Sequence, residues 1–198
     1  VTTDLSIAGR HFRLDWHAPE TVGHRTLARG LSDLAAMGAR PVAAFLSLGL
    51  PPELTRARGR GISWIDRFYT GFLALAKEAG VPLAGGDLAQ APLALADVVL
   101  VGAVPRGRAL LRSGARPGDL LYVTGALAGA AAGLEQLATL AAASKRAGPP
   151  KIPAKLMGLL TPHLTPRPRL AQGLWLQKRG LASAAIDLSD GLSTDLTH

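Results

Sequence analysis

The sequence of 198 residues is long enough to bury a hydrophobic core in one domain, or in one domain and part of a second. Apolar residues make up 48%, aromatic residues 5% and charged residues 18%, which excludes a disordered chain and indicates an Ala- and Leu-rich α/β protein. The net charge of +8 would suit nucleic acid, a membrane surface or a phosphorylated ligand.

The first half of the chain is predicted to alternate strands with helices. In chain order the elements are a strand end at 1–4, a helix over 19–37, a strand over 41–50, a helix over 65–79, and strands over 82–85 and 96–104. Pro19 suits a first helical turn and Gly38 suits a helix end. The helix over 65–79 rests on apolar residues that recur at steps of three and four.

The second half begins after a loop over 105–118 that is rich in Arg, Gly and Pro and marks the best candidate domain boundary. The elements predicted beyond it are a strand over 119–124, a helix over 127–143, a linker over 144–153, a Pro/Arg-rich stretch over 162–169, a helix over 170–179, a strand over 184–188 and a helix starting near 190. This alternation predicts an α/β or interleaved α+β fold. Because the sequence opens without methionine and stops soon after that last helix begins, we expect a truncated chain.

Several classes of site and location are disfavoured by what the sequence lacks. There is no cysteine, hence no disulfide or thiolate metal site, and the dispersed histidines predict no zinc site. No apolar run reaches the ~18 residues of a membrane span, and no signal peptide is recognisable. We therefore expect a cytoplasmic protein with no membrane partner. The arginines are scattered and no aromatic RNA-reading motif accompanies them, so we also expect no nucleic-acid partner.

Five aspartates stand at the ends of apolar runs or within them: Asp4, Asp33, Asp87, Asp187 and Asp190. A carboxylate beside a buried run is costly unless it is paired or binds a metal. Mg²⁺ prefers a few carboxylate oxygens together with waters and substrate phosphates. A single aspartate at a strand end or helix start is more often a cap or turn residue, however, and Asp190 could cap the helix that follows. The pattern leaves both interpretations open.

Two other stretches are compatible with phosphate binding. Gly85 and Gly86 precede Asp87 and would let a backbone approach a phosphate, although Gly-Gly is equally common in turns. Arg112 and Arg116 lie in one loop and could clamp a polyphosphate. The sequence contains no P-loop, no complete protein-kinase motif set and no Gly-x-Ser-x-Gly elbow, so ATP use does not follow from a general motif.

Five segments in order carry a resemblance to a known family: VTTDLSIAGRHF, LSDLAAMGARP, LAGGD, LLRSGARPGDLLYVTG and AIDLSDGLSTDL. Together they resemble thiamine-monophosphate kinase, in the superfamily that includes aminoimidazole ribonucleotide synthetase and selenophosphate synthetase. The resemblance implies an N-terminal ATP- and metal-binding dimerisation domain over 1–107, whose mixed sheet pairs into a dimeric β-barrel. It also implies an incomplete C-terminal α/β domain over 108–198.

The activity that the resemblance implies is direct in-line transfer of the ATP γ-phosphoryl group to thiamine monophosphate by a homodimer. Mg²⁺ would be the metal and ATP the co-substrate. The implied metal ligands are Thr2, Thr3, Asp4, Asp33, Asp87, Asp187 and Asp190. The implied ATP contacts are Gly86, Asp87, Arg112 and Ser189, and His11 would contact thiamine monophosphate. Phosphoryl transfer depends on charge neutralisation and positioning, so no general base is assigned.

Two departures from the family pattern keep alternatives open. Leu88 follows Gly-Gly-Asp where the family usually has threonine, and Gly30 replaces a common asparagine. One alternative is another ATP-using enzyme of the superfamily with a different phosphate or carboxylate substrate. The other is a catalytically silent member that binds ATP or metal and acts through protein contacts.

Overall fold

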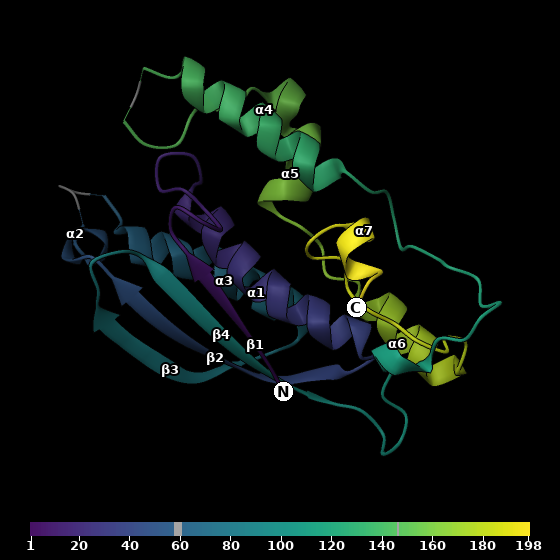
Figure 1. Cartoon of the computed structure of the whole chain (residues 1–198). Coiled ribbons are helices and arrows are strands. Elements are labelled where there is room, and N and C mark those ends of the chain that lie inside the picture. The colour runs from purple at the N-terminus through teal and green to yellow at the C-terminus, as the bar shows by residue number, and fades with distance from the viewer. Residues whose placement is uncertain (58–60, 146) are drawn as a thin grey trace.

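A four-stranded mixed sheet covered by two helices forms the first half of the chain (Figure 1). The computed structural model describes residues 1–57, 61–145 and 147–198. The strands are β1 (Thr2–Ile7), β2 (Arg40–Leu50), β3 (Leu83–Gln90) and β4 (Leu95–Ala103). Their order is β1-β4-β2-β3, in which β4 is antiparallel to both β1 and β2, and β2 is parallel to β3. The predicted mixed α/β architecture is confirmed.

The two long helices of this half begin and end where the sequence predicts. Helix α1 (Pro19–Ala36) has its proline in the first turn, where the missing N–H costs nothing. Helix α3 (Trp64–Ala79) is capped by Ser63, whose Oγ accepts a hydrogen bond from the N–H of Asp66 at 3.2 Å. It ends at Gly80, in the left-handed conformation. Because β2 and β3 are parallel, α3 serves as the crossover between them. A short helix, α2 (Pro52–Thr55), was not predicted.

The main core lies between the helices and one face of the sheet. The fully buried side chains there are Phe68 and Phe72 from α3, Leu27 and Leu31 from α1, and Val98 from the sheet. Side chains alternate between the faces of a strand, so in β4 the even-numbered residues from 96 to 100 are buried against the helices. The odd-numbered residues point to the opposite face, which we call the open face.

The second half of the chain is helical. It contains α4 (Gly129–Ala143), α5 (Met157–Leu164), α6 (Leu170–Arg179) and α7 (Leu192–Asp195), with short 3₁₀ turns η1 (Arg112–Gly114) and η2 (Ala154–Leu156). Helices α4 and α5 pack together around Leu137, Leu160 and Leu164, and α6 packs beside α1 (Figure 1). The predicted helices at 127–143 and 170–179 are confirmed, whereas α5 was missed because Pro162 lies inside it.

The predicted strands over 119–124 and 184–188 are wrong, because neither segment forms a strand. A strand requires a partner for its backbone groups, and the described ranges supply neither segment with a ladder. Leu120 and Tyr122 are 77% and 81% exposed, so the apolar pattern of the first segment finds no core to face. The predicted linker over 144–153 includes residue 146, which lies outside the described residues.

Within the three described ranges, no helix is both long enough and apolar enough to cross a membrane.

Candidate functional site

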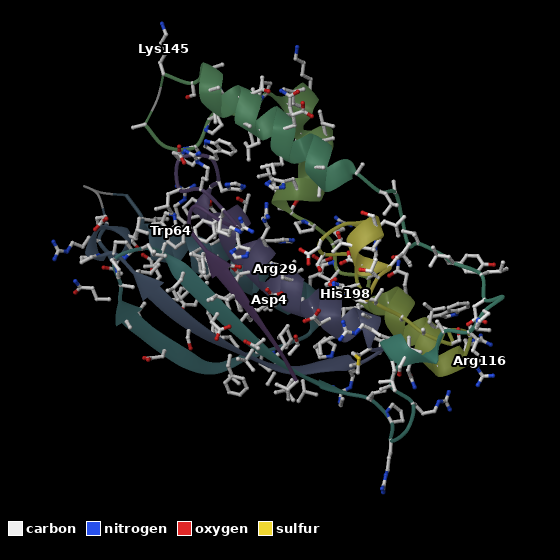
Figure 2. All side chains as sticks on the ribbon, in the orientation of Figure 1. Asp4, Arg29, Trp64, Arg116, Lys145 and His198 are labelled. Atoms are coloured by element: carbon white, nitrogen blue, oxygen red, sulfur yellow. The ribbon has the colours of Figure 1, made fainter. Side chains whose placement is uncertain are left out.

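Three aspartates from distant parts of the sequence gather beside β1 and α1. Asp4 lies on β1, Asp33 on α1, and Asp187 on the segment before α7; we call these three the acidic group. The hydroxyl of Thr2 donates a hydrogen bond to Asp33. Asp4 forms an ion pair with Arg29 at 2.6 Å, and Figure 2 shows these two side chains between β1 and α1.

The backbone periods of the two elements explain this arrangement. On β1 the even-numbered residues Thr2 and Asp4 point toward the helix layer, since the buried Ser6 shares their face. On α1, Arg29 and Asp33 are four residues apart and therefore lie on one side of the helix. Asp33 stands in the last turns of α1, so it is not the cap of a helix start.

The electrostatics of the acidic group favour a cation. Burial raises the pKa of Asp4 to about 6, outweighing the nearby Arg29, and the charges of Asp33, Asp187 and Asp97 raise it further. Burial is also the main cause that raises the pKa of Asp187, with Asp33 adding to it and a hydrogen bond from Ser32 opposing it. One guanidinium thus faces several carboxylates that repel one another.

The donor chemistry of the acidic group fits Mg²⁺. Within the described ranges, no set of three or more His, Asp or Glu side chains is arranged to hold a metal ion by itself. Mg²⁺ usually takes only one or two carboxylates and completes its shell with waters and substrate phosphates. A partial set of mutually repelling carboxylates is therefore the kind of site that such an ion would occupy together with a phosphorylated ligand.

Asp87 lies apart from the acidic group. In the sheet register Asp87 pairs with Ser47, and Ser47 pairs with Asp97 on β4, so these three side chains form one row on the open face. Thr3 joins the row through a hydrogen bond from its hydroxyl to Asp97 Oδ1 at 2.9 Å. Asp87 is on the edge strand opposite β1, about 14 Å away at ~4.8 Å per strand. One chain therefore does not bring Asp87 and Asp4 together.

The backbone around Asp87 is specialised. Gly86 has a φ of 151°, and a Cβ there would collide with the carbonyl oxygen of Leu46. The N–H of Leu88 donates to Asp87 Oδ1 at 2.8 Å. The Leu88 side chain is 52% exposed, so the departure at this position leaves the strand intact. Gly30, the other departure, is buried in α1 against the side chain of Leu100.

Ser189 and Asp190 are exposed in a turn whose geometry was not foreseen. The N–H groups of Ser189, Asp190 and Gly191 donate to the buried carboxylate of Asp195, at 3.0, 3.2 and 3.1 Å from its Oδ2. The N-cap of α7 is Gly191, so Asp190 does not cap that helix. Sequence reasoning missed Asp195; the signal that could have found it is its position four residues after the glycine of Ser-Asp-Gly.

His11 borders a small pocket with cationic walls. Its Nδ1 accepts a hydrogen bond from the N–H of Ile7 at 3.0 Å. Burial lowers the pKa of His11, and Arg29 adds to the effect. The pocket is lined by Ser6, His11, Phe12, Val22, Arg25, Thr26 and Arg29. Two guanidiniums and two hydroxyl groups on its walls suit an anion.

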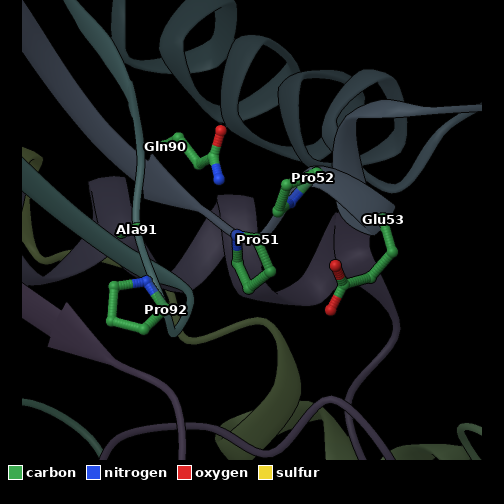
Figure 3. A pocket seen from close by; sticks show the side chains of 6 residues that line it. All are labelled: Pro51, Pro52, Glu53, Gln90, Ala91 and Pro92. Carbon is green, nitrogen blue, oxygen red and sulfur yellow. The ribbon is translucent and has the colours of Figure 1, made fainter.

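Arg112, the last predicted contact, lies exposed in η1. This loop runs beside residues 183–185, where the N–H of Ala185 donates to the carbonyl of Leu111 at 3.2 Å. A separate pocket is lined by Pro51, Pro52, Glu53, Gln90, Ala91 and Pro92 (Figure 3). None of the predicted site residues lines that pocket, and we assign it no role.

A buried polar junction that the sequence did not reveal joins α1 to α5. The Nε2 atoms of His17 and His163 lie 3.0 Å apart, and Arg25 Nη1 lies 2.6 Å from the same nitrogen of His163. Arg25 Nη1 also donates to the carbonyl of His163 at 3.0 Å, and His24 Nε2 lies 2.8 Å from the carbonyl of Pro166. The two halves of the chain are therefore connected through arginine and histidine side chains and backbone carbonyl groups.

The chain is similar to known proteins along its whole length. Residues 1–104 match the family described as AIR synthase related protein, N-terminal domain. The whole chain is 41% identical to thiamine-monophosphate kinase of Salmonella typhimurium and 42% identical to that of Escherichia coli K12, and covers 55% of each. The chain thus spans about half the length of these curated relatives.

Solved structures give the same likeness. A thiamine-monophosphate kinase from Stenotrophomonas maltophilia K279a has a TM-score of 0.81 at 40% identity, over 98% of this chain and 57% of that one. The enzyme from Aquifex aeolicus has a TM-score of 0.81 at 32% identity, over 96% and 59%. A structure described as AaThiL complexed with AMPPCP and TMP has a TM-score of 0.84 at 32% identity, over 98% and 57%.

Proposed function

Since the chain belongs to the AIR synthase related protein family, we propose that the whole protein is a thiamine-monophosphate kinase. It transfers the γ-phosphoryl group of ATP directly to thiamine monophosphate and yields thiamine diphosphate without a phosphoenzyme. The relatives with this name match the chain from end to end, and a related structure is described as a complex with AMPPCP and TMP.

The observation that carries the proposal is the convergence of the acidic group. Asp4, Asp33 and Asp187 belong to three elements, and their charges raise the pKa of Asp4. Natural folds rarely gather carboxylates in a half-buried place without a cation or a polyphosphate–metal complex to offset them. Mg²⁺ bound there would neutralise the phosphate oxygens of ATP.

The chain's own residues would bind and orient the reactants. Asp4, Asp33 and Asp187 would hold the metal, while Thr2 fixes one carboxylate through its hydrogen bond to Asp33. Asp190, exposed in its turn, would bind metal, and Ser189 would contact ATP. Gly86, Asp87 and Arg112 are the other ATP contacts we propose. His11 would contact the phosphate of thiamine monophosphate beside the two guanidiniums of its pocket. No residue is required as a general base, because positioning and charge carry most of this reaction.

A homodimer would explain the location of Asp87 and Thr3. Both lie on the open face, where Leu5 and Phe45 are 43% and 38% exposed. Pairing of two such faces would form the proposed β-barrel and would bury these apolar side chains. Asp87 of one protomer could then serve the acidic group of the other.

We also propose domains over 1–107 and 108–198, the latter incomplete here; the family match ending at 104 supports the boundary. A cytoplasmic location stays a prediction.

The deciding experiment is a steady-state assay of the whole protein with ATP, Mg²⁺ and thiamine monophosphate. We expect thiamine diphosphate to form at a rate that depends on all three. ATP binding without any thiamine diphosphate would contradict the proposal and would favour the silent member of the superfamily. Turnover with a different phosphorylated or carboxylate acceptor would favour another enzyme of the superfamily.

A further inference from the structure

Asp195 is a buried carboxylate with an unusual set of partners. It ends α7 and is only 3% exposed, whereas the turn before it is exposed. Its Oδ2 accepts the N–H groups of Ser189, Asp190 and Gly191, and Oδ1 lies 3.4 Å from the N–H of Asp190. Three consecutive amides therefore converge on one side chain.

Hydrogen bonds in both directions connect Gly191 and Asp195. The N–H of Asp195 donates to the carbonyl of Gly191 at 2.9 Å, while the N–H of Gly191 donates back to the Asp195 carboxylate. Gly191 has a φ of 106°, a conformation that other residues rarely adopt. Hydrogen bonds to an ionised acceptor are about twice as strong as neutral ones. The backbone of 189–191 is thus fixed by a carboxylate beneath it.

This turn carries the side chains to which the proposed function gives ligand contacts. Ser189 and Asp190 are exposed on it, and Asp187 stands two residues before it in the acidic group. Asp195 itself is buried beneath the turn. Its effect on a ligand would therefore pass through the direction in which the turn presents these three residues.

We propose that Asp195 is a positioning residue that holds the turn 189–191 in the geometry needed to bind Mg²⁺ and ATP. This inference rests on the proposed function, since it assigns Asp187, Ser189 and Asp190 to those ligands. Groups that orient metal ligands from behind typically affect metal affinity or activity by 10- to 100-fold. An alanine would leave three amides without their acceptor, whereas an asparagine keeps the shape and one acceptor oxygen.

The test compares Asp195→Asn with the wild type in the whole protein. Calorimetric titration of Mg²⁺ in the presence of AMPPCP should show roughly 10- to 100-fold weaker binding in the variant. In the kinase assay, kcat should fall by a similar factor while KM for thiamine monophosphate stays within about twofold, because the turn does not contact that substrate in our assignment. Unchanged Mg²⁺ affinity and unchanged kcat would overturn the proposal.

Asp66→Asn is the matched control. Asp66 is likewise a carboxylate in the first turn of a helix, in α3, where its Oδ2 accepts a hydrogen bond from the Ser63 hydroxyl at 2.5 Å, but its side chain is exposed. Any general cost of removing such a carboxylate should appear in both variants, but only Asp195→Asn should weaken Mg²⁺ binding. Equal loss in the control would mean that the effect is structural and would also overturn the proposal.

A readout without ligand separates this proposal from the proposed function. In amide NMR spectra of the free protein, the signals of Ser189, Asp190 and Gly191 should move upfield in Asp195→Asn, since their charged acceptor is gone. If the wild type bound no Mg²⁺–AMPPCP, the kinase proposal would fail, but the amide shifts would still report on the turn. If the amide signals did not move in Asp195→Asn, only the positioning role of Asp195 would be contradicted. Should Asp195→Asn fail to fold, Gly191→Ala distorts the same turn from its other side and should weaken Mg²⁺ binding by about tenfold. Unchanged affinity there would count against the proposal.

Discussion

The buried histidine pair shows how single residues fix a protonation state. Nδ1 of His17 lies 3.1 Å from the backbone nitrogen of Arg13 and 3.2 Å from its carbonyl oxygen, and Nε2 of His17 lies 3.0 Å from Nε2 of His163. Burial lowers the pKa of His17 to about 4 and that of His163 to about 3, and Arg25 is the second cause in both. Both rings are therefore neutral at pH 7.

A loss of stability in mild acid should follow from this pair. Because the folded pKa lies below the unfolded value of 6.5, the unfolded chain takes up protons first as the pH falls, and stability present above pH 6.5 is lost progressively toward pH 4. For His17 alone the loss at pH 5 is about 2 kcal/mol. Asp4, whose pKa is raised to about 6, acts in the opposite direction over part of the same range.

The variant His163→Gln separates the contribution of the histidine pair to acid stability from that of Asp4. Glutamine keeps an acceptor near Arg25 but cannot titrate, so urea unfolding at pH 7 and pH 5 should show the variant losing less stability than the wild type. The difference between the two pH dependences should be on the order of 1–2 kcal/mol. Parallel curves for variant and wild type would show that the pair does not control acid stability.

Asp87→Asn and Asp190→Asn should each lower turnover by at least 100-fold while the protein stays folded. Both side chains are exposed, so the substitutions remove little packing, but lost ligand charge is lost stabilisation of the transferring phosphoryl group. The check is a kinase assay beside a thermal unfolding curve. Near-normal turnover in both variants would show that these carboxylates are structural.

Among elements, β3 depends on one residue for its close approach to β2. Gly86→Ala should destabilise the protein by more than about 2 kcal/mol, because the side chain would meet the Leu46 carbonyl at a positive φ. Gly85→Ala is the control: its Cβ would lie 3.3 Å from the Phe45 ring, which can yield slightly. Comparable denaturation midpoints for both variants would contradict the prediction.

Elements were predictable from the sequence where their stabilising contacts are local. Helix α3 could be recognised because its cap at Ser63, its apolar period and its end at Gly80 all lie within the segment itself. The segments over 119–124 and 184–188 carry apolar patterns of a strand, but a pattern does not supply the neighbouring backbone that a strand needs. Helix α5 was missed for the opposite reason: Pro162 disfavours a helix locally, but packing on α4 stabilises the helix despite it.

The candidate site was predictable as a list of residues but not as an arrangement. The apolar settings of Asp4, Asp33 and Asp187 pointed to a shared role, and the fold brings these three together. The sequence could not reveal that Asp87 lies on the other face of the sheet, because that depends on strand register. Arg29 and Asp97 were missed since their roles come from contacts with β1, far away in sequence.

For the whole molecule, the open face is expected to control assembly. Phe45→Glu places a charge in its exposed apolar area and should convert the proposed dimer to a monomer, because burying the carboxylate without a partner is costly. Sedimentation equilibrium would measure the change, and activity should fall with the dimer if Asp87 acts across the interface.

Leu73→Glu provides the matched control for assembly. Leu73 is 47% exposed on α3, in the helix layer on the far side of the sheet from the open face. This variant should remain a dimer with normal activity. A monomeric wild type, or a dimer that survives Phe45→Glu, would place the interface elsewhere.

The pairing of the first strand with the last strand of the sheet has a consequence for synthesis on the ribosome. Thr2 pairs with Leu100, so β1 cannot dock until nearly a hundred further residues have been made. At about 5–20 residues per second this takes roughly 5–20 s, during which β1 lacks its partner strand β4. Such long-range closure also slows folding after release. Thr2, Thr3 and Asp4 therefore reach their final places late, and a chaperone that shields β1 until β4 has been made would speed the maturation of the site.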